Sequence, residues 1–128
     1  MYQTLPLNAL AMVIEDDEKL SAIYCQALKA AGFTAQPART GEQAYSGLPI
    51  FLPALVILDL QLPDARGEEI LQYIRSDPCF ENTWVIVATS EPALTTNLHG
   101  IADLVLIKPV SYTQLRDLAL RFRKTTTE

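Results

Sequence analysis

The chain has few of the residues that commonly carry redox or metal chemistry. Its 128 residues include one histidine and two cysteines. Cys25 and Cys79 fall in no metal-ligand spacing, so neither a zinc site nor a redox site is indicated, and reduced thiols in a cytosolic protein are expected. His99 has no acid or nucleophile at a recognisable spacing, and we expect it on the surface rather than in catalysis.

Positive charge is also scarce. Ten lysines and arginines against fifteen aspartates and glutamates leave a net charge of −5. Because binding to phosphates requires a basic surface, direct binding to nucleic acid is not expected. The sequence lacks both an apolar run long enough to span a bilayer and a secretory signal at its start. We therefore expect a soluble, cytoplasmic protein with no membrane partner.

The domain organisation is simple. The sequence contains no internal repeat, low-complexity segment or linker, and 49% of its residues are apolar. This length and composition suit one compact domain with a real core. We expect a single domain over residues 1–128, in which residues 1–7 and 124–128 form flexible tails.

Apolar runs of strand length alternate with helical patterns along the whole chain. Strands are predicted at 9–14, 33–38, 55–59, 84–88 and 104–107. Helices are predicted at 20–31, at 41–47, after Gly67 until Asp77, at 92–98 and at 112–123. Pro37 favours an edge position for the second strand. Five such alternations predict the α/β class, with a doubly wound five-stranded parallel sheet covered by helices on both faces.

The third predicted strand ends in an acid. Leu55–Asp59 is a continuous apolar run that finishes with a carboxylate, and such runs are typical of a strand buried on both faces of a parallel sheet. Open α/β sheets bind ligands at the carboxyl ends of their strands. Taken alone, Asp59 would be read as a cap of the next helix.

Three other strand ends carry polar groups that would meet Asp59 at the same edge. Glu15 and Asp16 follow the first strand, Thr89 and Ser90 the fourth, and Lys108 the fifth. Each has an ordinary explanation as a helix cap or a solvated charge. Because chance seldom brings acids, a hydroxyl and an ammonium to one edge in this order, together they predict a functional site.

These segments resemble a known family. The stretches 13–17, 58–64 with Gly67, 87–90 and 107–109 are similar to the response-regulator receiver domains of two-component signalling, of the chemotaxis-regulator type. The resemblance covers essentially the whole chain. It implies a flavodoxin-like fold with strand order 2-1-3-4-5.

The resemblance also implies roles for the acids. Asp59 would be the phosphoacceptor, and Mg²⁺ would be held by Glu15, Asp16, Asp59 and the backbone carbonyl of Gln61. The chemistry agrees, since phosphoryl transfer to an aspartate beside other acids requires a cation. A hard cation that keeps several waters needs only one or two direct carboxylate ligands, which fits Asp16 and Asp59, with Glu15 acting through water.

The remaining site residues follow from the same resemblance. Thr89 would be the switch hydroxyl, and Lys108 would contact the phosphoryl group as a point charge. A cis bond before Pro109 would turn the lysine inward. Gln61 and Glu91, each two residues after a site residue, would modulate water access and hence autodephosphorylation.

Two features depart from the family pattern. Val105 occupies the position, three before the lysine, where an aromatic switch residue is common. The interval from Thr89 to Lys108 is shorter than expected by about three residues, close to one helical turn. We therefore expect a shortened fourth helix and an altered relay from the site to an output surface.

The family implies partners rather than an enzyme with a separate substrate. These would be a histidine kinase or phosphotransfer protein, a downstream protein target or fused output domain, and a possible dimer partner. The exposed side of the first helix, with Lys19, Ala22 and Gln26, is a candidate docking surface for the kinase or simply a solvated face. The domain would take part only in its own phosphorylation and dephosphorylation.

Two other classes of function are left open. The first is a pseudo-receiver, an interaction module that is never phosphorylated, against which the complete acidic set argues. The second is an enzyme on the same fold. An aspartyl-phosphate hydrolase would need a second acid after the nucleophile, where Leu60 and Gln61 stand, and a flavin protein would need a phosphate loop in place of the acids after the first strand.

Overall fold

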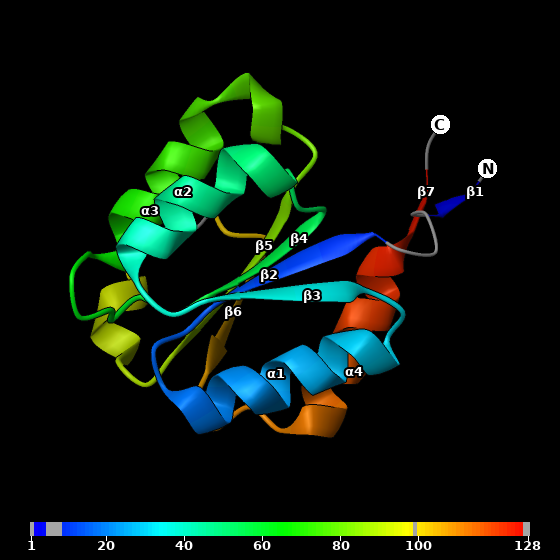
Figure 1. Cartoon of the computed structure of the whole chain (residues 1–128), viewed down its shortest axis with the longest axis horizontal. Coiled ribbons are helices and arrows are strands. Elements are labelled where there is room, and N and C mark those ends of the chain that lie inside the picture. The colour runs from blue at the N-terminus through cyan, green and yellow to red at the C-terminus, as the bar shows by residue number, and fades with distance from the viewer. Residues whose placement is uncertain (1, 5–8, 99, 127–128) are drawn as a thin grey trace.

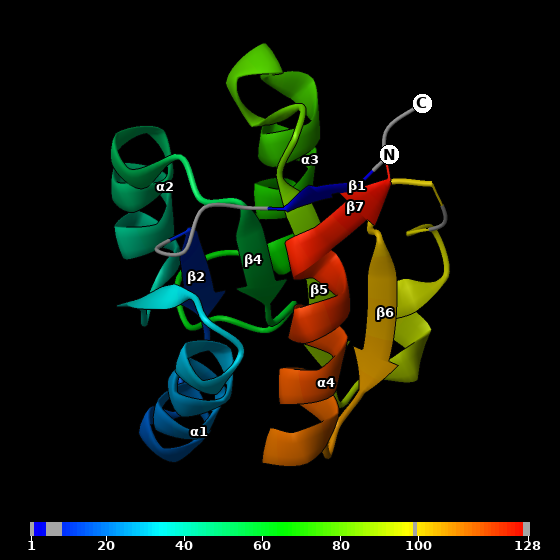
Figure 2. The same ribbon diagram turned by 90° about the vertical axis from the view of Figure 1, so that its right-hand side faces the viewer.

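A computed structural model describes residues 2–4, 9–98 and 100–126, with the backbone alone for 2–4 and 124–126. Its centre is a parallel sheet in the order β3-β2-β4-β5-β6 (Figure 2). Counted along the chain within this sheet, the order is 2-1-3-4-5, which confirms the predicted topology. The strands are β2 (Leu10–Ile14), β3 (Thr34–Ala38), β4 (Leu55–Leu58), β5 (Trp84–Thr89) and β6 (Leu104–Ile107).

Burial along the strands explains their order in the sheet. Every residue of β4 is buried, as a strand covered on both faces must be. Pro37 lacks a backbone N–H and lies in β3, which pairs only with β2 among the described strands. The predicted edge position of this strand is therefore confirmed.

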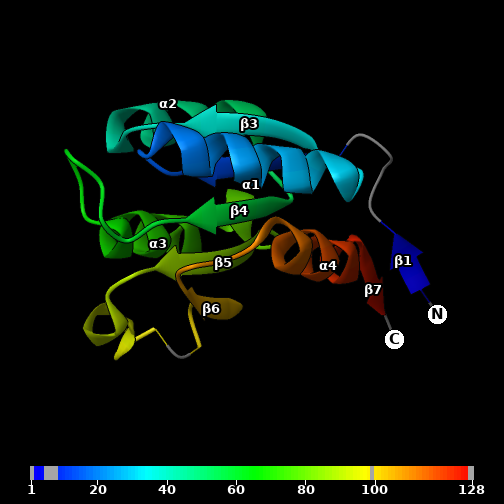
Figure 3. The ribbon, with the colours of Figure 1, turned by 90° about the horizontal axis from the view of Figure 1, so that it is seen from below.

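Helices cover both faces of the sheet (Figure 1 and Figure 3). One face carries α1 (Glu18–Ala30) and α4 (Tyr112–Arg123), and the other carries α2 (Gly41–Phe51) and α3 (Gly67–Ser76). Because successive strand residues point to opposite faces, β4 supplies alternate side chains to two separate buried clusters. The sheet therefore has a core on each side, as expected for a doubly wound fold.

Helix α2 extends beyond its predicted end at residue 47. It continues through Pro49 to Phe51 and ends at Leu52, which has a positive φ of 45°. The backbone N–H of Leu52 donates to the carbonyl of Leu48 at 2.9 Å. A proline in a last helical turn removes only one backbone hydrogen bond there, and the burial of Leu48 between helix and sheet favours the longer helix.

The segment between β5 and β6 contains only a short 3-10 helix, η2 (Pro92–Thr95). The helix predicted at 92–98 is thus shorter and tighter, in line with the expected loss of about one turn. Arg75 of α3 holds the end of this segment, because its guanidinium donates to the carbonyl of Ile101 at 2.6 Å and to the carboxylate of Asp103 at 2.7 Å. A second 3-10 helix, η1 (Pro78–Phe80), follows α3.

Two short strands lie near the ends of the chain. Strand β1 (Tyr2–Thr4) pairs antiparallel with β7 (Lys124–Thr126), away from the main sheet (Figure 1 and Figure 3). These segments belong to the tails predicted to be flexible, and their mobility stays a prediction. The other tail residues, 1, 5–7, 127 and 128, lie outside the described residues, as does His99.

We expect the α2–α3 side of the core to depend on Leu71. Its side chain is 0% exposed, whereas Leu120 on α4 is 45% exposed. Leu71→Ala should lower the free energy of unfolding by about 2–5 kcal/mol, because it leaves a cavity. Leu120→Ala, the matched control, should change it by no more than about 0.5 kcal/mol. Urea denaturation of both variants checks this, and equal losses would contradict the assigned burial.

Candidate functional site

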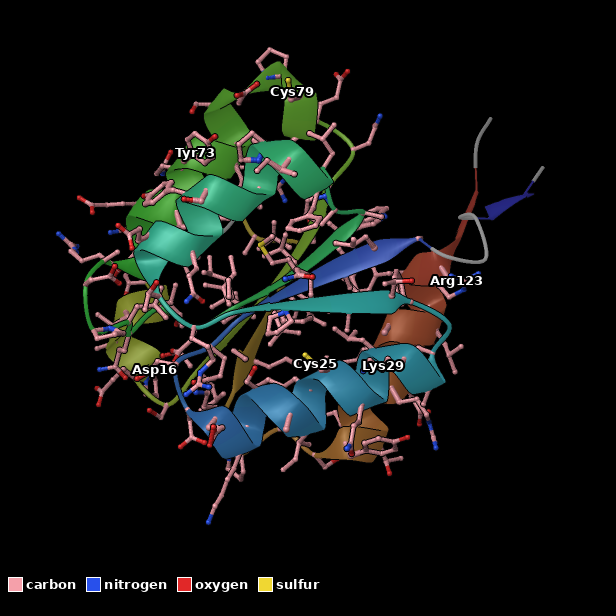
Figure 4. All side chains as sticks on the ribbon, in the orientation of Figure 1. Asp16, Cys25, Lys29, Tyr73, Cys79 and Arg123 are labelled. Carbon is pink, nitrogen blue, oxygen red and sulfur yellow. The ribbon has the colours of Figure 1, made fainter. Side chains whose placement is uncertain are left out.

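The carboxyl ends of the central strands bring the predicted site residues to one edge of the molecule. Glu15 follows β2, Asp59 follows β4, Thr89 ends β5 and Lys108 follows β6. Figure 4 shows Asp16 at this edge, near the beginning of α1. One carboxylate oxygen from each of Glu15, Asp16 and Asp59 lies within 4.8 Å of the others. The predicted convergence of the acids is therefore observed.

Lys108 bridges two of these acids. Its ammonium lies 2.7 Å from Glu15 Oε1 and 3.3 Å from Asp59 Oδ2. The side chains of Glu15, Asp59 and Lys108 are only 2%, 6% and 15% exposed. Ion pairs so poorly solvated persist only with close geometry and further hydrogen bonds, and both conditions are met here.

Backbone groups provide these further hydrogen bonds. The N–H of Asp17 donates to Glu15 Oε2 at 3.2 Å, and the N–H of Gln61 donates to Asp59 Oδ1 at 3.1 Å. Asp17 also caps α1, because its carboxylate accepts from the N–H of Leu20 at 2.9 Å. Both buried carboxylates are thus fixed through both of their oxygens.

The electrostatics of the site favour a further cation. Burial raises the pKa of Glu15, although the hydrogen bond from Lys108 opposes this effect. Burial would lower the pKa of Lys108, but the hydrogen bond to Glu15 and the charge of Asp59 outweigh it, and the pKa is raised. One ammonium faces three carboxylates, so the cluster carries excess negative charge. Three oxygen donors of this kind, one of them on exposed Asp16, fit a hard divalent cation.

A close contact shapes the loop that follows Asp59. A Cβ atom on Gly67 would lie 2.4 Å from the Cα of Leu60 and 2.6 Å from the carbonyl oxygen of Asp59. The N–H of Gly67 donates to the carbonyl of Leu60 at 2.9 Å. Only glycine fits here, because a side chain would push this backbone, and Asp59 with it, out of place.

Thr89 and Lys108 are adjacent on neighbouring strands. The backbone N–H of Lys108 donates to the carbonyl of Thr89 at 2.9 Å, and the bond from Lys108 to Pro109 is cis, as the resemblance implied. The fully buried Thr89 hydroxyl accepts from the N–H of Glu91 at 3.2 Å. The hydroxyl is therefore tied to the loop after β5.

The other predicted residues lie around this cluster. Gln61 and Glu91 are exposed at its rim, and Gln61 Oε1 accepts a long hydrogen bond of 3.5 Å from the hydroxyl of Ser90. Val105 is half-buried in β6 and packs on the α2–α3 side of the sheet. The exposed side of α1 includes Lys19, Ala22 and Gln26, as predicted.

Two residues near the site were missed by the sequence analysis. Tyr24 of α1 is 1% exposed, and its hydroxyl has no hydrogen-bond partner among the described residues. A polar ring in the apolar stripe of the first helix could have drawn attention to it. Arg39 donates to the backbone carbonyl of Asp16, a contact that no spacing in the sequence indicates.

Comparison with known proteins identifies the family. The profile described as response regulator receiver domain matches residues 11–120. The chain belongs to this family. A phosphate regulon transcriptional regulatory protein, PhoB of Rhizobium meliloti, is 33% identical over 106 residues, which cover 80% of this chain and 47% of that protein.

Other relatives place the receiver in two-component signalling. The sensor histidine kinase AtsR of Burkholderia thailandensis is 28% identical over 94% of this chain and 21% of its own length. The BeF3-activated receiver domain of DrrB from Thermotoga maritima has a TM-score of 0.78 and 26% identity, and the match covers 90% of this chain and 97% of that one. The chain spans about half or less of the length of these curated relatives.

Among the helices that the structure describes, none has the length and apolar character needed to cross a bilayer.

Tyr24 leads to a prediction about alkaline pH. Burial raises the pKa of its phenol, the charge of Lys108 opposes this, and the charges of Glu15 and Asp59 add to it. A pKa above the unfolded value of about 10 means that the folded state binds more protons above this pH, so stability falls as the pH rises.

In Tyr24→Phe this part of the alkaline decline should be absent. We compare the free energy of unfolding of the variant with that of the unchanged protein at each pH. This difference should be up to about 1.4 kcal/mol more favourable to the variant at a pH of about 11 than at a pH of about 8. Urea unfolding at both pH values measures this difference. Tyr112→Phe, which alters a 37% exposed side chain, is the control and should show no such gain. An identical pH dependence of the Tyr24 variant and the unchanged protein would refute the assignment.

Proposed function

We propose that this receiver accepts a phosphoryl group on Asp59 in a two-component phosphorelay. The observation that carries the proposal is the cluster of Glu15, Asp16 and Asp59, bridged by Lys108, at the carboxyl edge of a receiver sheet. In this reading Asp59 is the nucleophile, and the other groups neutralise charge around it.

The acidic cluster would hold Mg²⁺. Its ligands would be Asp16, Asp59 and the backbone carbonyl of Gln61, and Glu15 would act through water. Bound magnesium supplies charge neutralisation for the transferring phosphoryl group and for the aspartate that receives it. The oxygen donors and the excess negative charge described above support this assignment.

Phosphoryl transfer forms a bond from an Asp59 carboxylate oxygen to phosphorus and breaks the bond from phosphorus to a histidine nitrogen of the donor. The N–H of Gln61 and the ammonium of Lys108 orient the carboxylate for this attack. Lys108 then shifts its contact from Asp59 to a phosphoryl oxygen and stabilises the product. The domain contributes to its own phosphorylation without acting as an enzyme on a second substrate.

Thr89 would report the new charge. A phosphoryl group adds nearly two negative charges and strong acceptors beside the Thr89 hydroxyl, which can donate to it and draw the loop after β5 inward. Gln61 and Glu91 stand at the rim, where they would control access of water to the phosphoaspartate. The short η2 helix and Val105 would make the relay differ from one based on a long helix and an aromatic switch residue.

The proposed partners follow from the relay. A histidine kinase or phosphotransfer protein would donate the phosphoryl group and dock on the exposed side of α1 near Lys19, Ala22 and Gln26. A downstream protein or a fused output domain would read the change, and a second receiver could pair with this one. The setting would be the cytoplasm.

We expect Mg²⁺ to stabilise the folded receiver. A ligand that binds only the folded state, at a concentration about tenfold above its Kd, increases the free energy of unfolding by about 1.4 kcal/mol. This increase raises Tm by several degrees. Asp16→Asn should abolish this rise because it removes a direct ligand. Thermal melts with and without millimolar MgCl2 measure it, and superimposable melts of the unchanged protein would rule out the metal site. Asp117→Asn removes a carboxylate of α4 that is not part of the acidic cluster, so it is the control and should keep the full rise.

Acetyl phosphate should label the receiver on Asp59. Asp59→Asn should lose the label, whereas its circular dichroism spectrum should stay native because the amide can keep the hydrogen bond from Gln61. Phosphate-affinity electrophoresis and mass spectrometry measure the label and locate it. Failure of the unchanged protein to be labelled in the presence of Mg²⁺ would favour the pseudo-receiver alternative.

A further inference from the structure

The turn between β3 and α2, residues 39–42, contacts the loop that carries Asp16. The Arg39 side chain donates from Nε and from Nη2 to the backbone carbonyl of Asp16, at 3.0 Å and 2.7 Å. Two donors of one rigid, planar guanidinium converge on a single oxygen. They therefore restrain the backbone of Asp16, whose side chain is the exposed member of the acidic cluster.

The same turn contacts the loop that follows Asp59. The carboxylate of Asp64 accepts from the N–H of Gly41 at 2.7 Å and from the N–H of Glu42 at 3.1 Å. These N–H groups belong to the first turn of α2, where the helix itself offers them no acceptor, and their hydrogen bonds lower the pKa of Asp64. A Cβ atom on Gly41 would lie 2.4 Å from the Cβ of Ala65, so the loop and the turn are in close contact.

The turn is itself held by two hydrogen bonds with Gln43 in the first turn of α2. The N–H of Arg39 donates to Gln43 Oε1 at 2.7 Å, and the N–H of Gln43 donates to Thr40 Oγ1 at 3.1 Å. This arrangement is related to a capping box, except that Gln43 accepts from the N–H of Arg39, the residue before the N-cap Thr40, rather than from Thr40 itself. Because the turn is fixed to the helix, its contacts at either end cannot shift independently of each other.

We propose that residues 39–42 form a brace that holds Asp16 at the right separation from Asp59 and thereby raises the affinity for Mg²⁺. Arg39 and Asp64 are positioning residues in this proposal, which rests on the proposed function. Mg²⁺ requires nearly ideal octahedral geometry at about 2.0–2.1 Å from its ligands, so a loop that carries a ligand must be well placed. Groups that orient metal ligands are typically worth about 10–100-fold in metal affinity.

The positive charge of Arg39, considered alone, would lower the affinity for Mg²⁺. A guanidinium near a cation site repels the cation, so a purely electrostatic role predicts tighter binding of Mg²⁺ when the charge is removed. It also predicts no change when lysine preserves the charge. The brace predicts weaker binding in both cases, because neither lysine nor glutamine can direct two rigidly linked donors at the one carbonyl oxygen of Asp16.

The first experiment compares Arg39→Lys and Arg39→Gln in the full chain by calorimetric titration with MgCl2. We expect the Kd for Mg²⁺ to rise about tenfold in both variants. Arg121→Lys, an exposed change on α4, is the matched control and should leave the Kd unchanged. An unchanged Kd in Arg39→Lys, or a lower Kd in Arg39→Gln, would overturn the brace.

A second experiment tests whether the two ends of the turn act as one unit. Asp64→Asn should also weaken Mg²⁺ binding. The double variant, Arg39→Lys with Asp64→Asn, should lose little more affinity for Mg²⁺ than the weaker-binding of the two single variants. Fold-changes that simply multiply in the double variant would show two independent effects and overturn a shared brace. Asp117→Asn is the control for loss of a carboxylate.

Three readouts separate the possible failures. No binding of Mg²⁺ by the unchanged chain would overturn the proposed function and the brace with it. Binding by the unchanged chain with the same Kd in the Arg39 and Asp64 variants would overturn the brace alone. Thermal melts of the variants without Mg²⁺ identify a merely structural role of Arg39 and Asp64. Such a role would lower Tm but leave the Kd for Mg²⁺ at 15 °C unchanged, and that result would also refute the brace.

Discussion

The structure of the site depends on one contact, the ammonium of Lys108 between the carboxylates of Glu15 and Asp59. Two buried acids at neighbouring strand ends would repel each other and oppose the packing of the sheet edge. The position of Lys108 depends in turn on the pairing of β6 with β5, through the hydrogen bond from its N–H to Thr89. The electrostatics of the site and the register of the sheet therefore stabilise each other.

The sequence predicted the parts of the molecule that follow from local patterns. Strand ends, alternating burial and the polar residues after each strand can all be read along the chain, because parallel strands bring their carboxyl ends to one edge. To predict the order of the strands in the sheet, the family resemblance was needed as well. The roles given to Asp59, Gln61, Thr89 and Glu91 remain predictions, although the structure brings these residues to one edge.

The missed features depend on contacts between distant segments. The contact from Arg39 to the Asp16 carbonyl joins residues 23 positions apart and uses a backbone acceptor, which no motif encodes. The extension of α2 through Pro49 depends on burial of Leu48 against the sheet, and local propensity argues against it. The interval before Lys108 predicted a shortened helix, but the contact of Arg75 in α3 with Ile101, at the end of this segment, appears only in three dimensions.

The pairing of β1 with β7 brings both ends of the described chain to the side of the molecule opposite the acidic site (Figure 1 and Figure 3). Paired strands lie about 5 Å apart, so a longer polypeptide would enter and leave the domain at almost the same point. A domain with adjacent ends can be inserted into a loop of another protein, or joined to either end of that protein, without distorting the structure of the other protein. In either case the point of attachment lies away from the edge of the sheet that carries the acidic cluster.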